Sequence, residues 1–154
     1  MPLNLTYAQN NKQFKLQKNK EPMTDNCIFC KIAKGEIPCN KIYEDNEYVA
    51  FLDINPLNKG HALVIPKKHF RWVYDVEDQG KYWTVAQKMT KKLLEKMHAS
   101  YVMFVTLGEE VHHAHIHVIP RYENDGHVGF PDFKNKKSIS AEEMKQIAEK
   151  IKIK

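Results

Sequence analysis

Apolar positions recur along the chain with two different periods. Between residues 79 and 98 they fall three or four apart, which is the spacing of one face of a long helix. This stripe consists of Tyr82, Val85, Ala86, Met89, Leu93 and Met97. A second helix is predicted to begin at Ser140, which forms a capping-box pattern with Glu143. Its apolar face consists of Met144, Ile147, Ala148 and Ile151.

Short apolar runs bounded by turn-forming residues predict strands. They lie at 41–45, 47–53, 61–66, 101–106 and 111–119. Residues 27–34 suit a short helix, with Asp25 or Asn26 as its cap and Gly35 as its end. Strands in series with one long helix between them favour an α+β fold with an antiparallel sheet over a parallel wound sheet.

The chain divides into three parts by composition. Residues 1–22 are rich in Asn, Gln and Lys without an apolar period, so we expect a flexible N-terminal arm. Residues 23–133 hold the predicted strands and the long helix, and a length of 154 residues suits one compact domain. Residues 134–154 are expected to form a helical tail.

The net charge of +5 is concentrated in the two ends of the chain. Residues 1–22 hold four lysines and one glutamate, and residues 134–154 hold seven lysines and three glutamates, so the middle is slightly negative. A nucleic-acid partner is not expected, because such a surface places positive charge on the folded core. No apolar run approaches the roughly 20 residues of a spanning helix, so no membrane association is expected either.

The cysteines also indicate the cellular compartment. Cys27, Cys30 and Cys39 leave one thiol over in any disulfide pairing, and no apolar segment typical of an export signal follows the N-terminal lysines. We therefore expect a cytoplasmic protein. In a reducing compartment a Cys-x-x-Cys pair more often indicates metal or redox chemistry than a disulfide.

Four of the eight histidines lie within six residues, at 112, 113, 115 and 117. Side chains alternate faces in a strand, so a strand here would align His113, His115 and His117 on one face. Such a row suits two chemistries. Neutral imidazoles can share a metal ion, or a neutral imidazole can attack phosphorus when an acceptor holds its far ring nitrogen protonated.

Four sequence blocks together resemble the histidine triad (HIT) superfamily of nucleotide hydrolases and transferases. They are CIFCKIAKGEIP at 27–38, YEDNEYVAFLDINP at 43–56, GHALVIPKKH at 60–69 and HAHIHVIPR at 113–121. The resemblance implies a five-stranded antiparallel sheet with a long helix, paired into a homodimer. It also implies a purine nucleotide substrate, either a nucleoside phosphoramidate or a dinucleoside polyphosphate.

The resemblance assigns the catalytic roles. His115 would attack the α-phosphate and form a nucleotidyl-histidine, and His117 would hydrogen-bond the phosphate or the departing atom. The main chain near His113 would fix the tautomer of His115. His61 matches a histidine that supports the family's site.

The resemblance also assigns nucleotide contacts. Asp53 sits where family members bind the ribose hydroxyls, and Phe29, Phe51 and Ile54 match positions that line the base pocket. An ordinary core role for Phe29 and Phe51, and a turn role for Asp53, remain open as alternatives.

A structural zinc ion is a further implication, because some members bind one with residues that match Cys27, Cys30, His69 and His113. A closed Cys2His2 set is tetrahedral and structural. The alternative is two ordinary cysteines.

One loop departs from the family pattern. Glu109 and Glu110 replace a Gln and a Ser that are common before the triad, and carboxylates repel phosphate, so we expect both side chains to turn away or bind something else. The departure keeps open a non-catalytic nucleotide-binding protein, and the histidine row keeps open a metal-centred hydrolase. The lysine-bearing tail favours polyphosphate substrates.

Overall fold

The computed structural model describes residues 26–153, so the expected arm at 1–22 lies outside the described residues. The elements follow in the order α1 (Ile28–Lys34), β1 (Lys41–Glu44), β2 (Tyr48–Leu52), β3 (Ala62–Pro66), a 3-10 turn (Val73–Asp75), α2 (Gln79–Met97), β4 (Tyr101–Val105), β5 (Ile116–Arg121) and α3 (Ala141–Ile151). The strands form one antiparallel sheet in the order β1-β2-β3-β5-β4. The α+β prediction is confirmed.

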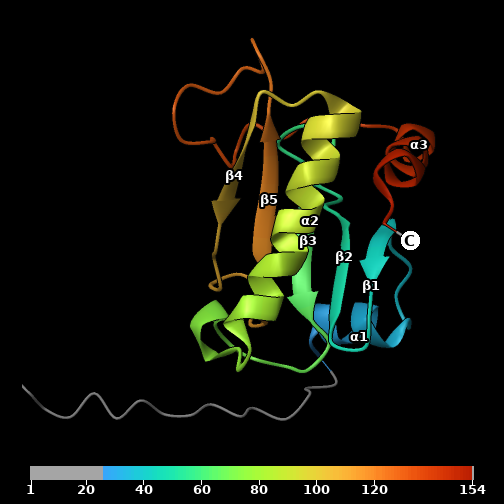
Figure 1. The fold of residues 1–154 in the computed structure, drawn as a ribbon, viewed down its shortest axis with the longest axis vertical. Helices are drawn as coiled ribbons and strands as arrows, with labels where there is room; N and C mark the ends of the chain where they lie inside the picture. The colour runs from blue at the N-terminus through green and yellow to red at the C-terminus, as the bar shows by residue number, and fades with distance from the viewer. Residues whose placement is uncertain (1–25, 154) are drawn as a thin grey trace, which may run out of the picture.

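The sheet is buried on both faces where β2 and β3 cross its centre. Ala50, Leu52 and Val64 belong to the main core cluster together with the apolar face of α2, which lies across one face of the sheet (Figure 1). Alternate residues, Phe51 and Leu63 among them, belong to a second cluster with α1 on the other face. This two-sided burial explains why both strands are continuously apolar.

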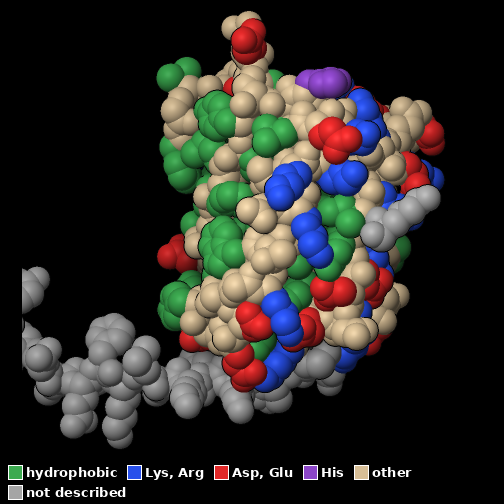
Figure 2. Space-filling model, in the orientation of Figure 1, with side chains coloured by type: hydrophobic (Ala, Val, Ile, Leu, Met, Phe, Trp, Pro, Cys, Tyr) green, Lys and Arg blue, Asp and Glu red, His purple; other side chains and the backbone are tan. Residues whose placement is uncertain are grey.

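Helix α2 is positioned by both of its ends and by its predicted stripe. The Asp78 side chain accepts from the Lys81 backbone N–H at the start, and His98 ends the helix in the left-handed conformation. Tyr82 is fully buried and its hydroxyl donates to the Val64 carbonyl oxygen at 2.8 Å. The outer face carries lysines and glutamates, whereas hydrophobic side chains gather over β4 (Figure 2).

Helix α3 packs on the main core. The Ser140 hydroxyl accepts from the Glu143 backbone N–H, as the capping pattern predicts. The four predicted apolar residues of α3 are buried in the cluster that includes α2. After the helix, the Ile153 N–H donates to the Ile42 carbonyl oxygen, so the end of the chain lies against β1. Within residues 26–153, no helix is long and apolar enough to span a membrane.

The start of α1 differs from the prediction. Its cap is Cys27 rather than Asn26, because the Cys27 thiol accepts from the Cys30 backbone N–H at 3.4 Å. Asp25, the other predicted cap, lies outside the described residues. The helix ends at Gly35 as predicted, where a φ of 79° favours a residue without a Cβ. Because Cys27 caps the helix, its thiol is held beside the first turn of α1.

The histidine strand also differs from the prediction. Strand β5 begins at Ile116, so His113 and His115 precede it and the expected row of three histidines on one strand is wrong. Ladder pairing with β3 stops at Val64 opposite Ile116. Before that point the Ala114 N–H donates to the Phe70 carbonyl oxygen at 2.6 Å, outside the sheet. The irregular backbone lets the triad side chains serve two different sites.

Candidate active site

A cavity of about 430 Å³ lies beside α1, next to the ends of β2 and β5. All of the nucleotide-contact residues expected from the sequence line it: Phe29, Phe51, Asp53, Ile54 and His61. His115 and His117 line the same cavity, whereas the side chain of His113 does not. Five expected contacts and two of the three triad histidines are therefore brought together.

The apolar part of the cavity combines core and lining roles. Phe29 and Phe51 are both buried and their rings meet edge-to-face at 5.8 Å between centroids. The Phe29 ring also meets the His115 ring at 5.2 Å. Ile54, by contrast, is 79% exposed at the edge of the cavity. The core alternative for the two phenylalanines is thus compatible with a role as cavity walls.

His115 is held in one tautomer by the main chain. Its Nδ1 lies 2.6 Å from the His113 carbonyl oxygen, and because a carbonyl can only accept, Nδ1 carries the proton. Burial lowers the His115 pKa, against opposing contributions from that hydrogen bond and from the charges of Asp53 and Glu110. The ring is therefore neutral at pH 7, with a lone pair on Nε2 in the cavity.

His61 and His117 form a second chain with a defined proton order. The Leu57 N–H donates to His61 Nδ1 at 3.1 Å, so His61 carries its proton on Nε2. That nitrogen lies 3.0 Å from His117 Nδ1 and donates to it, which leaves the His117 proton on Nε2. Burial lowers the pKa of each ring to about 3, so both are neutral.

Asp53 makes the turn contact that was weighed from the sequence and also lines the cavity. One carboxylate oxygen accepts from the Asn55 N–H at 2.8 Å, which is a turn contact. The other oxygen lies 3.8 Å from His61 Nε2 and 4.0 Å from His117 Nδ1. These three groups are close enough to hold a cation, but the hydrogen bond between the histidines already uses both nitrogens. We therefore interpret Asp53 as an acceptor at the cavity wall.

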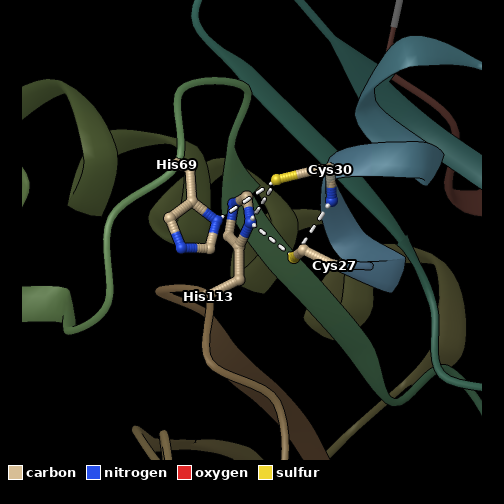
Figure 3. Close-up of side chains that lie close together, drawn as sticks. All are labelled: Cys27, Cys30, His69 and His113. Atoms are coloured by element: carbon tan, nitrogen blue, oxygen red, sulfur yellow. Dashed lines mark hydrogen bonds between the residues drawn. The ribbon is translucent and has the colours of Figure 1, made fainter. Parts of the chain in front are cut away.

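A second cluster of side chains joins three segments of the chain. Cys27 caps α1 and Cys30 lies in its first turn, His69 comes from the loop after β3, and His113 comes from the segment before β5 (Figure 3). All four side chains are buried and point toward one another. The four residues that the family resemblance assigned to zinc therefore lie close together in the fold.

The donor set fits a zinc ion in geometry and in protonation. Tetrahedral zinc with ordinary Zn–S and Zn–N bonds separates sulfur from nitrogen by roughly 3.5 Å. His113 Nδ1 lies 3.4 Å from Cys27 Sγ and 3.5 Å from Cys30 Sγ, and His69 Nδ1 lies 3.2 Å from Cys30 Sγ. His113 Nε2 donates to the Pro66 carbonyl oxygen at 2.8 Å, which directs the Nδ1 lone pair toward the sulfurs.

Comparison with known proteins identifies the family. The model of the HIT domain matches residues 34–124, which is more than half of the chain. The chain belongs to the HIT family. The adenosine 5′-monophosphoramidase of Schizosaccharomyces pombe is 38% identical over 133 residues, covering 81% of this chain and 95% of that protein.

Solved structures of HIT proteins share the fold. A HIT-like protein from Bartonella henselae matches with a TM-score of 0.71 and 32% identity, over 83% of this chain and 95% of that one. A Zn-bound histidine triad family protein from Mycobacterium smegmatis matches with a TM-score of 0.66 and 28% identity, over 82% and 93%. The fold expected from the HIT resemblance is therefore confirmed.

The HIT motif of this chain does not gather its three histidines around one ion. Within residues 26–153 the His113 ring belongs to the cysteine cluster, whereas His117 is grouped with His61 and Asp53. The geometry thus gives no support to a metal-centred hydrolase built on the histidine row. The physical reason is the irregular backbone before β5, which turns the first histidine away from the other two.

Sequence reasoning missed the outer wall of the cavity. Leu107 and Val111 come from the loop before the triad, and Phe133 and Lys136 come from the loop after β5. Glu109 and Glu110 also line the cavity, and the expectation that they turn away from phosphate or bind something else stays a prediction. No local pattern marks these positions, because two loops far apart in sequence meet only in the fold.

Proposed function

We propose that this protein is a nucleotide hydrolase that releases AMP from adenosine phosphoramidates. The observation that carries the proposal is the complementary protonation of two neighbouring rings in one cavity. His115 offers a lone pair at Nε2, and His117 offers an N–H at Nε2, with the ring centroids 5.0 Å apart. A nucleophile beside a hydrogen-bond donor suits attack at phosphorus. The relative from S. pombe, named as an adenosine 5′-monophosphoramidase, supports the same substrate class.

In the first step, the His115 Nε2 lone pair forms a bond to the α-phosphorus. The P–N bond of the substrate breaks, and its electron pair leaves with the amine nitrogen, which takes a proton from solvent. The His117 N–H donates to the phosphoryl oxygens, where negative charge increases. The His113 carbonyl keeps accepting from Nδ1 and so stabilises the positive charge on the substituted ring.

In the second step, water attacks the phosphorus of the nucleotidyl-histidine. The new P–O bond replaces the P–Nε2 bond, whose electron pair returns to His115, and the proton of the water passes to solvent. AMP is released and the starting tautomer of His115 is restored. Burial of His115 favours the neutral leaving ring over a charged one.

The nucleotide is proposed to bind with its base in the apolar part of the cavity. Phe29 and Ile54 lie on its walls, and α1 contributes Ile28 and Ile32. Asp53, with its second carboxylate oxygen available at the wall, suits the two ribose hydroxyls because a carboxylate accepts from both.

AMP release from adenosine 5′-phosphoramidate in the presence of EDTA tests this function. The wild type is expected to make AMP, and a rapid quench is expected to trap a nucleotidyl-protein. The His115→Ala variant is expected to give neither product while still binding AMP. Nucleotide binding by the wild type without any AMP release would contradict the proposal and favour a non-catalytic nucleotide-binding protein.

We further propose a structural zinc ion held by Cys27, Cys30, His69 and His113. When bound, such an ion would supply a closed crosslink between α1, the loop after β3 and the segment before β5, and no step of the reaction passes through it. The sulfur–nitrogen distances and the His113 tautomer support the proposal. Zinc stoichiometry of the purified protein, measured by mass spectrometry, tests it.

A homodimer is proposed for the assembly. Strand β4 is an edge strand, and it exposes Tyr101 and Phe104 beside Trp83 of α2. An exposed edge with apolar side chains is a template for pairing with a second copy. Light scattering after size-exclusion chromatography tests this assembly, and a Phe104→Lys variant is expected to be monomeric.

A further inference from the structure

Part of the cavity wall has no role among the proposed nucleotide contacts and forms a region of its own. Two loops enclose it, residues 106–112 before β5 and residues 122–137 after β5. From these loops, six residues line the cavity: Leu107, Glu109, Glu110, Val111, Phe133 and Lys136. Both loops reach the two catalytic rings, because Phe133 contacts the His117 ring and the charge of Glu110 acts on His115.

The first loop is anchored by its backbone. Arg71 donates to the Gly108 carbonyl oxygen, and a Cβ at Gly108 would lie 2.7 Å from the Trp72 ring. The loop is therefore fitted against Trp72 at a position that only glycine allows. The next two residues, Glu109 and Glu110, line the cavity, and within residues 26–153 neither carboxylate takes part in a hydrogen bond or ion pair.

The second loop is anchored by a buried ion pair. Arg121 Nε donates to Asp125 at 2.7 Å, and both side chains are 4% exposed. Asp125 also accepts from Asn58 at 2.8 Å, which ties this loop to the one between β2 and β3. The loop then brings the Phe133 ring against His117, at 5.4 Å between centroids.

A second observation independent of the carboxylates points to a ligand in the same space. His115 is 6% exposed and lines the cavity, yet its Nε2 takes part in no hydrogen bond within the described part of the chain. The two loops thus add an apolar ring, which contacts His117, and two carboxylates to the cavity that holds the reacting nitrogen. Among the described residues that line the cavity, Lys136 is the one lysine or arginine, so this part of the wall carries a net negative charge.

We propose that this region is a subsite for an amine leaving group that has an apolar body and a second, distal cationic group. The body packs on Phe133, Leu107 and Val111, and the distal ammonium or guanidinium group binds Glu109 and Glu110. A polyphosphate leaving group is disfavoured, because the two carboxylates repel it more than Lys136 attracts it. This inference rests on the proposed function and specifies its substrate class.

Three adenosine phosphoramidates with leaving groups of nearly equal length test the subsite. Their amines are hexamethylenediamine, hexylamine and aminocaproate, which carry a distal positive charge, no charge and a negative charge. The wild type is expected to show kcat/KM in that order, with about tenfold between the first and the last, since two partly exposed charge pairs are involved. Added salt is expected to reduce the ratio.

Matched variants locate the effect. In the Glu109→Gln, Glu110→Gln double variant the ratio of cationic to anionic substrate is expected to fall toward one, whereas Lys136→Gln is expected to raise it. Glu123→Gln removes an exposed carboxylate that does not line the cavity, and it is expected to leave the ratio unchanged. Equal kcat/KM values for the three substrates, or a preference for aminocaproate, would overturn the subsite.

Binding separates this inference from the proposed function. Affinities of the same three compounds for the His115→Ala variant, measured by calorimetry, are expected to follow the same order without turnover. If the wild type released no AMP but this order held, the proposed reaction would be wrong and the subsite would stand. If AMP were released while the affinities were equal, the subsite would be wrong and the reaction would stand.

Discussion

The cavity and the cysteine–histidine cluster share His113, through its carbonyl in the first and its ring in the second, and they differ in which ring nitrogen carries the lone pair. In the cluster, the His113 ring is anchored through Nε2 to the Pro66 carbonyl, which leaves Nδ1 facing the sulfurs. In the cavity, the His115 ring is anchored through Nδ1 to the His113 carbonyl, which leaves Nε2 facing the ligand space. Two residues apart, the same side chain presents its lone pair on Nδ1 in one case and on Nε2 in the other, which suits the proposed roles of metal ligand and nucleophile.

The difference teaches that a backbone carbonyl decides the chemistry of a histidine. A carbonyl accepts a hydrogen bond and so fixes the proton on the nearer ring nitrogen, while the lone pair appears on the other. The cluster is closed by side chains from three segments, which suits a structural role. The cavity is open on one side, which suits turnover. Substitutions in the two regions should therefore affect different properties.

The largest expected effect is on turnover, from His115→Ala. Removal of the nucleophile is expected to lower kcat/KM by at least about 10³-fold, as when a member of a catalytic constellation is deleted. The melting temperature and the zinc content are expected to change little, because the His115 ring is not part of the cluster. Steady-state kinetics and calorimetry on the same preparation measure both. A parallel loss of zinc would contradict the separation of the two sites.

The next effect is expected from His61→Phe, which fills the volume but removes the donor to His117. Without that donor the His117 tautomer is no longer fixed, and kcat is expected to fall by about 10- to 100-fold. KM is expected to change less, since His61 supports a catalytic ring rather than the base walls. An unchanged kcat would show that the His61–His117 hydrogen bond does not contribute to catalysis.

A smaller effect, on stability, is expected from Cys27→Ser. Serine keeps an acceptor for the Cys30 N–H and so keeps the cap of α1, while the sulfur ligand is lost. Zinc content and melting temperature are expected to fall, the latter by roughly 5 °C, because an ion that binds only the native state stabilises it.

Cys39→Ser provides the control for this prediction. Cys39 is partly exposed and stands outside the cluster, so its replacement is expected to leave the zinc content and the melting temperature unchanged. Equal losses in the two variants would contradict a metal site at Cys27.

The smallest effect is expected from a change of pH, which acts on the free energy of unfolding. Burial lowers the pKa of His61 and of His117 to about 3, against an ordinary value near 6.5. Below about pH 6.5 the unfolded chain therefore binds more protons than the native one, and stability falls as the pH falls from there toward 3. Each group is expected to remove about 1 kcal/mol from the free energy of unfolding between pH 7 and pH 5.5.

Urea denaturation at pH 7 and pH 5.5 measures this loss. The His61→Phe variant is expected to lose less stability over the same interval than the wild type, because it lacks one of the two buried rings. An identical loss in both proteins would show that His61 does not account for the pH dependence.

Local patterns in the sequence were enough for most of the fold. The period of α2 and the continuous apolar runs of β2 and β3 predicted these elements, because the same side chains that define the pattern are those that must leave water. The start of β5 was wrong by five residues, because the backbone before Ile116 pairs with the loop after β3 rather than with the sheet. That partner is distant in sequence and leaves no local signal.

The sequence by itself determined which chemistry-bearing residues this protein has, and the tertiary structure decided what each of them does. The spacing of Cys27 and Cys30 indicated a metal pair, but their meeting with His69 and His113 depends on how three segments pack. The histidine motif indicated metal or phosphoryl chemistry, but the protonation of each ring depends on a carbonyl or N–H supplied by the fold. Hydrogen-bond partners and charged neighbours are properties of positions in space, and a linear pattern does not contain them.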